Sequence, residues 1–232
     1  MIGADYEKIH FVLFGLNLVE PMAIITDTIL GVLGVWFAIS ISKIKIDIPF
    51  RTYWIWFFIV FGVGAFVGGL GHTFFEYWGI PGKFPSWLAG PLSIFLLEQG
   101  MIAAHPDEKK LSLYKLISFW KLVLVYIIFA IVCFKAPIHE KPSLAFLPIA
   151  MNTIVGIILT AGFLGKFYSK KIAIEFKYFV FGVIILLPTA FIFLLKINLH
   201  PWFDKNDLSH ILMMIAIYYF YLGVKKTIGN FK

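Results

Sequence analysis

The stretch FDKNDLSHILMMIAIYYFYLG, from Phe203 to Gly223, decides the fold because it joins a polar start to a long apolar run. From Leu208 onward it carries no Asp, Glu, Lys or Arg. Crossing the ~30 Å core of a bilayer takes about 20 mostly apolar residues in a helix. Asn206, Asp207 and His210 stand where this run begins, and such groups are costly if they face hydrocarbon. The stretch therefore predicts a membrane helix whose first turn faces other polar groups.

The composition of the whole chain indicates the same class. Apolar residues make up 60% of it and charged residues 14%, with a mean hydropathy of +0.89. A soluble domain of this length would have too little polar surface to cover itself. The single cysteine, Cys133, excludes disulfides within the chain and a cysteine-rich metal site. Asp5 and Glu7 stand where a secretory signal would carry positive charge, so no cleaved leader is expected.

Hydropathy divides the chain into seven apolar stretches joined by short loops rich in Pro, Gly and Lys. We expect an all-α, seven-transmembrane helix bundle that forms one membrane domain over residues 1–232. The predicted spans are 19–41, 53–78, 86–104, 116–134, 143–164, 178–198 and 207–223. The apolar run ahead of the first span, residues 9–18, is too long to belong to it. We expect these residues to form a surface helix or a packed lead-in.

The positive charges divide unevenly between the loops on the two sides. Most of the 20 Lys and Arg residues fall on one side: Lys43, Lys45, Arg51, Lys109, Lys110, Lys115, Lys121, Lys166, Lys170, Lys171, Lys177, Lys225, Lys226 and Lys232. The other side holds Lys8, Lys83, Lys135, Lys141, Lys196 and Lys205. Short cytoplasmic loops carry such an excess, so we expect an external N-terminus and a cytoplasmic C-terminus. The net charge of +7 thus reflects topology, and no nucleic-acid partner is expected.

Ionisable side chains recur inside the predicted spans. They are Glu20, Asp27, His72, Glu76, Glu98, Asp207 and His210. Helical spacing places Glu20 with Asp27, His72 with Glu76, and Asn206 with His210, each pair on one helix face. The first and seventh spans begin, and the second ends, on the outer side. We therefore expect six polar groups to converge on a cavity there: Glu20, His72, Glu76, Asn206, Asp207 and His210. Two histidines with nearby carboxylates are typical of a zinc site.

Two other features of the spans leave alternatives open. Glu98 lies nearer the cytoplasmic side, so we expect it to be neutral or paired with a group such as Lys121 or Asn152. The second span carries five glycines: Gly62, Gly64, Gly68, Gly69 and Gly71. Such a small-residue face favours close helix packing, and the alternative is room for a substrate beside His72.

The pattern N-D-x-x-H followed by Y-Y-F-Y-x-G (Asn206 to Gly223), with His72 late in the second span and Glu20 opening the first, resembles the CREST superfamily of seven-helix membrane proteins. That superfamily includes alkaline ceramidases and adiponectin/progestin-receptor-type proteins, and the chain resembles a bacterial branch of it. The resemblance implies a bacterial cytoplasmic-membrane protein with bound zinc. His72 and His210 match two family ligands, and Asn206 takes the position of the third. In the family, a serine one turn before the first histidine and an aspartate in the next helix assist a zinc-bound water. The position of that serine falls on Gly68 here, and no aspartate stands early in the third span.

The hypothesis that follows is a zinc-dependent hydrolase of a lipid amide or ester. His72 and His210 would hold the metal with a carboxylate, Asp207 or Glu76, in place of the missing histidine. Glu20, Asp27 or Glu76 would act as general base, and membrane lipids would be the partners. A non-enzymatic sensor, or a protein that binds a small molecule or cation, is the alternative. A third reading is a membrane protein whose polar groups only cap helices. The sequence does not determine the oligomeric state.

Overall fold

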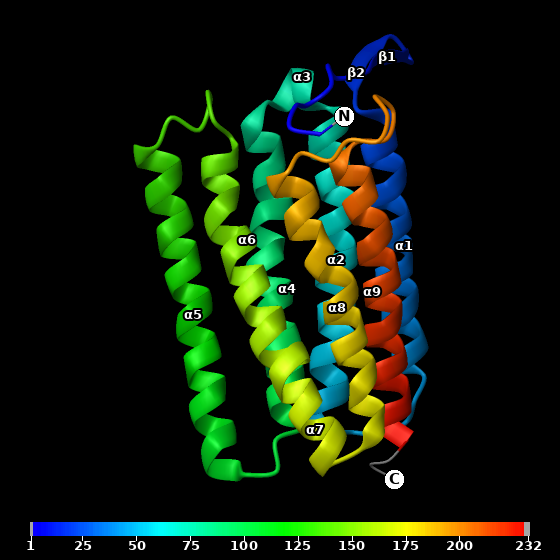
Figure 1. Ribbon diagram of the computed structural model, residues 1–232, viewed down its shortest axis with the longest axis vertical. Helices are drawn as coiled ribbons and strands as arrows, with labels where there is room; N and C mark the ends of the chain where they lie inside the picture. The colour runs from blue at the N-terminus through cyan, green and yellow to red at the C-terminus, as the bar shows by residue number, and fades with distance from the viewer. Residues whose placement is uncertain (1, 230–232) are drawn as a thin grey trace.

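The computed structural model describes residues 2–229 and is a bundle of long helices with a small hairpin at one end (Figure 1). The long helices are α1 (Pro21–Ser42), α2 (Pro49–Thr73), α4 (Phe84–Ala103), α5 (Glu108–Lys135), α6 (Ser143–Ile157), α8 (Lys177–Leu194) and α9 (Lys205–Ile228). The shorter elements are α3 (Phe75–Trp78), α7 (Gly165–Lys171), η1 (Ile80–Lys83), the π-helical η2 (Ile158–Leu164) and η3 (Ile174–Phe176). The prediction of an all-α class is confirmed.

Six helical segments are long and apolar enough to cross a membrane, and they make this an integral membrane protein. They are α1, α2, α5, α9, the continuous run of α6, η2 and α7, and α8 with η3. Helix α4 is not among them, because Glu98, Gln99 and Pro91 reduce its apolar character. Both Glu98 and Gln99 are buried inside the bundle, however. The polar groups of α4 therefore face protein.

The helices stand side by side in an order that differs from the chain order. Helix α1 packs against α2 and α9, α2 against α4, and α8 against α9. Helix α5 is the outermost and contacts α4 and α6 (Figure 1). Helix α6 continues through η2, which contacts α8 near the end of the bundle that carries the C-terminus. In this arrangement α2, α4 and α9 each contribute polar residues to one cavity.

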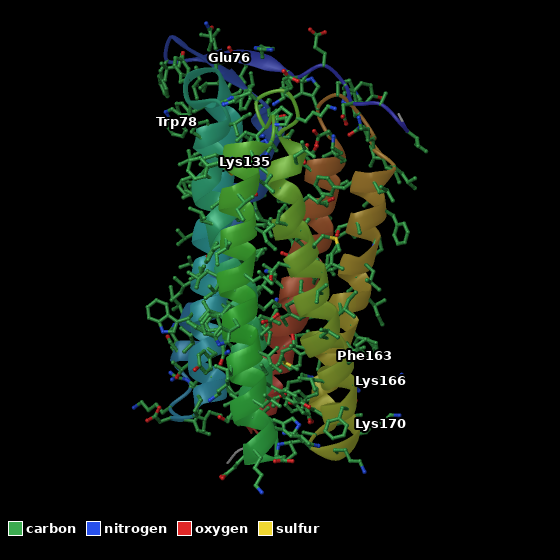
Figure 2. All side chains as sticks on the ribbon, turned by 90° about the vertical axis from the view of Figure 1, so that its left-hand side faces the viewer. Glu76, Trp78, Lys135, Phe163, Lys166 and Lys170 are labelled. Atoms are coloured by element: carbon green, nitrogen blue, oxygen red, sulfur yellow. The ribbon has the colours of Figure 1, made fainter. Side chains whose placement is uncertain are left out.

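The two ends of the bundle differ in charge. The loops after α1, α4 and α7 lie at the end that carries the C-terminus, and the hairpin, α3 and the α5–α6 and α8–α9 loops lie at the opposite, N-terminal end (Figure 1). Lys166 and Lys170 lie at the C-terminal end and Glu76 and Trp78 at the other (Figure 2). Lys121, assigned above to the lysine-rich loops, instead lies inside α5. Lys232 is outside the described residues.

Packing also differs between the two halves of the bundle. Aromatic rings fill the C-terminal half: Phe37 stacks on Tyr221 with 4.5 Å between ring centroids, and Trp54 stacks on Phe179 at 5.0 Å. Glycines bring α1 and α2 close there, since a Cβ on Gly34 would lie 2.8 Å from the carbonyl oxygen of Phe58. Close packing is therefore the role of the small residues in this half. The N-terminal half is less filled and contains the main cavity.

The region before α1 differs from its prediction. Residues 9–18 were expected to form a surface helix or a packed lead-in. Instead, β1 (His10–Leu13) pairs antiparallel with β2 (Leu16–Val19). Phe14 and Gly15 connect the strands with positive φ angles of 52° and 77°, the backbone that a two-residue hairpin turn requires. The helix prediction was wrong because apolar character alone does not distinguish a strand from a helix over so short a run.

Candidate functional site

A cavity of about 380 Å³ lies between α2, α4 and α9 in the N-terminal half of the bundle. Its polar lining consists of Asp27, His72, Lys83, Ser86, Ser93, Ser143, Asn206, Ser209 and His210. Its apolar lining includes Val60, Phe61, Ala65, Phe146, Phe193 and Met213. A cavity lined by both polar and apolar side chains suits an amphiphilic ligand. The structure thus brings His72, His210 and Asn206 together, as the sequence predicts, and adds Asp27 to them.

His72, near the end of α2, is held by Glu20. Its Nδ1 lies 2.5 Å from Oε2 of Glu20, and Oε1 of the same carboxylate lies 3.0 Å from Nζ of Lys8. Burial raises the pKa of Glu20, but the hydrogen bond to His72 and the positive charges nearby outweigh it and lower this pKa to about 2. Glu20 is therefore an ionised group that orients an imidazole. With Nδ1 occupied, Nε2 is the ring nitrogen left for a ligand.

His210, in the second turn of α9, is held by Thr26 of α1. Its Nδ1 lies 2.7 Å from Oγ1 of Thr26, which also donates to Oδ1 of Asp207 at 3.1 Å. When the hydroxyl hydrogen is donated to Asp207, Thr26 accepts from Nδ1–H of His210, and the lone pair of the ring is then on Nε2. That nitrogen lies 3.4 Å from Oδ1 of Asp27. Both histidines thus have Nδ1 engaged by a protein group.

Asp207 lies at the start of α9 and does not line the cavity. Its Oδ2 accepts from the backbone N–H of Asp204 at 3.1 Å, and the Asp204 side chain accepts from the backbone N–H groups of Asn206 and Asp207. This reciprocal arrangement is a capping box. Both oxygens of Asp207 are thus occupied by Thr26 and the helix start. Asp207 therefore contacts the site from outside the cavity, through Thr26.

Glu76 lies apart from the cavity. Helix α2 ends at Thr73, and Glu76 belongs to the separate four-residue α3. Its Oε1 is 3.9 Å from Nδ1 of His10, and both side chains are about half exposed. Figure 2 shows it at the N-terminal end of the molecule. The predicted shared face with His72 would have required one continuous helix, and the break after Thr73 separates the two residues.

His72, His210 and Asp27 are residue types that suit zinc. Their side chains do not, however, surround one position at which a metal could bind. Two imidazoles and one carboxylate are usual zinc ligands, and tetrahedral bonds of about 2.0–2.2 Å place two ligand atoms about 3.4 Å apart. The separation of Asp27 Oδ1 from His210 Nε2 is 3.4 Å. Within residues 2–229, however, no three His, Cys, Asp or Glu side chains lie close enough to hold a metal. His72 would therefore have to approach the other two.

The sequence did not predict a role at the cavity for three residues that line it or hold its histidines. Thr26 was not singled out, although a polar residue beside Asp27 in an apolar span is a detectable signal. Lys83 was treated only as a loop charge, yet it is partly buried, and its Nζ lies 3.5 Å from Nδ1 of His72. Burial lowers the pKa of Lys83 to about 8. Ser86 lies next to Gly68 in the cavity wall, since a Cβ on that glycine would lie 3.2 Å from the serine Oγ.

A second polar cluster lies deeper in the bundle, between α4, α5 and α6. Oε1 of Glu98 is 2.5 Å from Nζ of Lys121, and its Oε2 accepts from Ser118 at 2.5 Å. Lys121 also donates to Oδ1 of Asn152 at 2.7 Å. The Glu98 side chain is only 3% exposed, and none of these residues lines the cavity described above. The predicted pairing of Glu98 is confirmed.

These features define a helical integral membrane protein with a histidine- and carboxylate-lined cavity in one half of its bundle. The chain belongs to a family of unknown function, DUF6962, whose model matches residues 22–228. No curated protein and no solved structure matches the chain. The matched range contains every residue that lines the cavity, whereas Lys8 and Glu20 precede it.

Proposed function

We propose that this protein is a zinc-dependent membrane hydrolase of the CREST type that cleaves a lipid amide or ester. The observation that carries the proposal is that His72, His210 and Asp27 line one cavity together with apolar side chains such as Phe61, Phe146 and Met213. A lipid likewise combines a polar head with an apolar tail. We also propose seven spans, with α4 as the additional one, and an external N-terminal end, because the lysine-rich loops lie at the other end.

The residues of the chain have distinct roles in this proposal. His72, His210 and Asp27 would hold the metal. Asp27 thus takes the place of Asp207 or Glu76, the carboxylate ligands suggested by the sequence. Glu20 orients His72, and Thr26 orients His210, each through Nδ1. Zinc, when bound, polarises a carbonyl oxygen and lowers the pKa of a bound water. Phe61, Phe146 and Met213 exclude bulk water and contact the apolar part of the substrate.

Metal content is the first test. We expect about one zinc per chain in purified wild-type protein by elemental analysis, and its loss in His72→Ala and His210→Ala. His10→Ala is the matched control, because His10 is exposed and lies outside the cavity. Cleavage of fluorogenic N-acyl and ester lipids should disappear together with the metal. Metal-free wild-type protein, or cavity variants that behave as His10→Ala does, would rule the hydrolase out.

Asp27 can be tested separately as a ligand. If Asp27 is the third ligand, Asp27→Ala should lose zinc and Asp27→His should retain it, because imidazole can replace a carboxylate at zinc. If Asp27→Ala retains zinc and loses only hydrolysis, Asp27 is the general base.

One observation favours a second candidate, a non-enzymatic binder of small molecules. Across residues 2–229 no ready three-ligand metal group exists, and the ammonium of Lys83 lies beside His72. Saturable binding of a lipid by metal-free protein, with no product formed, would support this function over the hydrolase.

A further inference from the structure

Lys83 places a positive charge on the wall of the cavity without a carboxylate partner. It ends η1, is partly buried and lines the cavity. The nearest recorded contacts of its ammonium are Nδ1 of His72, at 3.5 Å, and the ring of Phe75, at 5.2 Å from the centroid. Among residues 2–229, Lys83 forms no ion pair within 4.0 Å. A desolvated cation normally has an anionic partner.

The carboxylates around the cavity are engaged elsewhere. Glu20 is bonded to His72 and paired with Lys8, at 2.5 and 3.0 Å. Asp27 lies on the α1–α9 side, 3.4 Å from Nε2 of His210. The hydroxyl-bearing Ser86 lines the cavity with Lys83, three residues further along the chain. The wall near Lys83 therefore offers an ammonium and a hydroxyl to a ligand oxyanion.

We propose that the cavity binds an anionic amphiphile, with a carboxylate or phosphate at Lys83 and an alkyl chain along Phe61, Phe146 and Phe193. This inference shares its cavity with the proposed function and gives the hydrolase a class of substrate or product. The charge pattern supports it, since the neighbouring Glu20 is already bonded to His72 and Lys8, and a neutral lipid would leave the ammonium of Lys83 without a direct ion pair. Lys gives a point charge for an oxyanion, and hydrogen bonds to charged groups are stronger than neutral ones.

The test is equilibrium binding to the full-length protein in phosphatidylcholine nanodiscs at pH 7 without added metal. The probes are radiolabelled dodecyl phosphate, laurate and dodecanol, which share one chain length and contain no carboxylic amide or ester bond for the proposed hydrolase to cleave. We expect at least one anion to bind about tenfold more tightly than dodecanol. The better of phosphate and carboxylate identifies a phospholipid-like or a fatty-acid-like head.

Variants locate the binding site at Lys83. Lys83→Met should reduce the affinity for the anion to that for dodecanol, and Lys83→Arg should retain most of the preference. Lys141→Met is the control, because Lys141 is exposed and does not line the cavity. Wild-type protein that does not prefer either anion, or Lys83→Met that keeps the preference, would overturn the inference. A zinc-free protein that still shows the preference would refute only the hydrolase.

Discussion

Two clusters of ionisable groups are buried in this bundle, and they differ in what their partners leave available. In the deeper cluster, Glu98 bonds to both Lys121 and Ser118, and the cluster does not line the cavity. In the cluster near the N-terminal end, His72 and His210 are each bonded through one ring nitrogen and line a cavity with the other available. A buried charge is therefore not a functional signal by itself. A histidine that a protein group holds through one ring nitrogen, and that lines a cavity with the other nitrogen available, is such a signal.

The contrast predicts that damage to the two clusters will have different consequences. Replacing His72, His210 or Lys83 at the cavity should remove ligand binding and leave the fold, whereas replacing Lys121 in the deeper cluster should destabilise the fold and leave ligand binding.

The largest expected effect is the loss of catalysis on removing a histidine of the cavity. If the proposed hydrolase is correct, His210→Ala should reduce kcat/KM for a lipid amide or ester by more than about 100-fold, because a metal ligand is lost. Its thermal unfolding midpoint in detergent should stay close to that of wild type measured without metal. An active His210→Ala protein would contradict the assignment.

Removing Lys121 should have the largest effect on stability. Lys121→Met leaves the Glu98 carboxylate buried without its cation, which typically costs about 3–5 kcal/mol. The free energy of unfolding in a denaturant titration should fall accordingly, and zinc content should not change. Adding Glu98→Gln to Lys121→Met should recover most of the loss, since no charge is then stranded. If the double variant is as unstable as the single one, packing rather than charge explains the loss.

Glu20 should give a pH-dependent contribution of intermediate size. Its pKa is lowered from 4.5 to about 2, so its ionised form stabilises the folded state by up to about 3 kcal/mol. That stability is present above pH 4.5 and is lost as pH falls towards 2. The difference in unfolding free energy between wild type and Glu20→Gln should therefore shrink over this range. A difference that is constant down to pH 2 would show that Glu20 does not act through its charge.

Two glycine substitutions should have smaller effects on stability. They compare a glycine in a tight contact between helices with a glycine that lines the cavity. Gly34→Ala places a Cβ 2.8 Å from a backbone oxygen of α2 and should cost about 1–3 kcal/mol of stability. Gly68→Ala places a Cβ 3.2 Å from Oγ of Ser86, in the cavity wall, and should cost less than about 1 kcal/mol. Gly68→Ala should instead weaken ligand binding a few-fold. Equal destabilisation by both would show that the two halves of the bundle are equally tight.

The smallest expected effect concerns the start of α9. Asp207 accepts from Thr26 and from the helix cap, so Asp207→Ala should lower the unfolding free energy by about 1 kcal/mol. Zinc binding should persist, because Asp207 does not line the cavity. Complete loss of the metal in this variant would restore Asp207 as a ligand.

Sequence reasoning predicted the positions of the helices well. The last predicted span, 207–223, lies within α9 (Lys205–Ile228), and the first, 19–41, differs from α1 (Pro21–Ser42) by two residues or fewer at either end. The predicted spans also placed His72 and His210 at the same end of the bundle. The failures were local: residues 9–18 form a hairpin, and the helix containing His72 ends before Glu76. Both depend on where backbone hydrogen bonding changes, which apolar composition does not reveal.

By itself, the sequence determined that the chain lies in a membrane, roughly where each span begins and at which end the polar groups gather. Covalent spacing along a helix sets the depth of a residue, so these properties can be read from one segment at a time. Only the tertiary structure decided that Asp27 and Lys83 line the cavity, that Asp207 caps a helix and that Glu98 is neutralised by Lys121. The physical reason is that the direction of a side chain depends on the rotation of its helix, and packing against neighbouring helices sets that rotation.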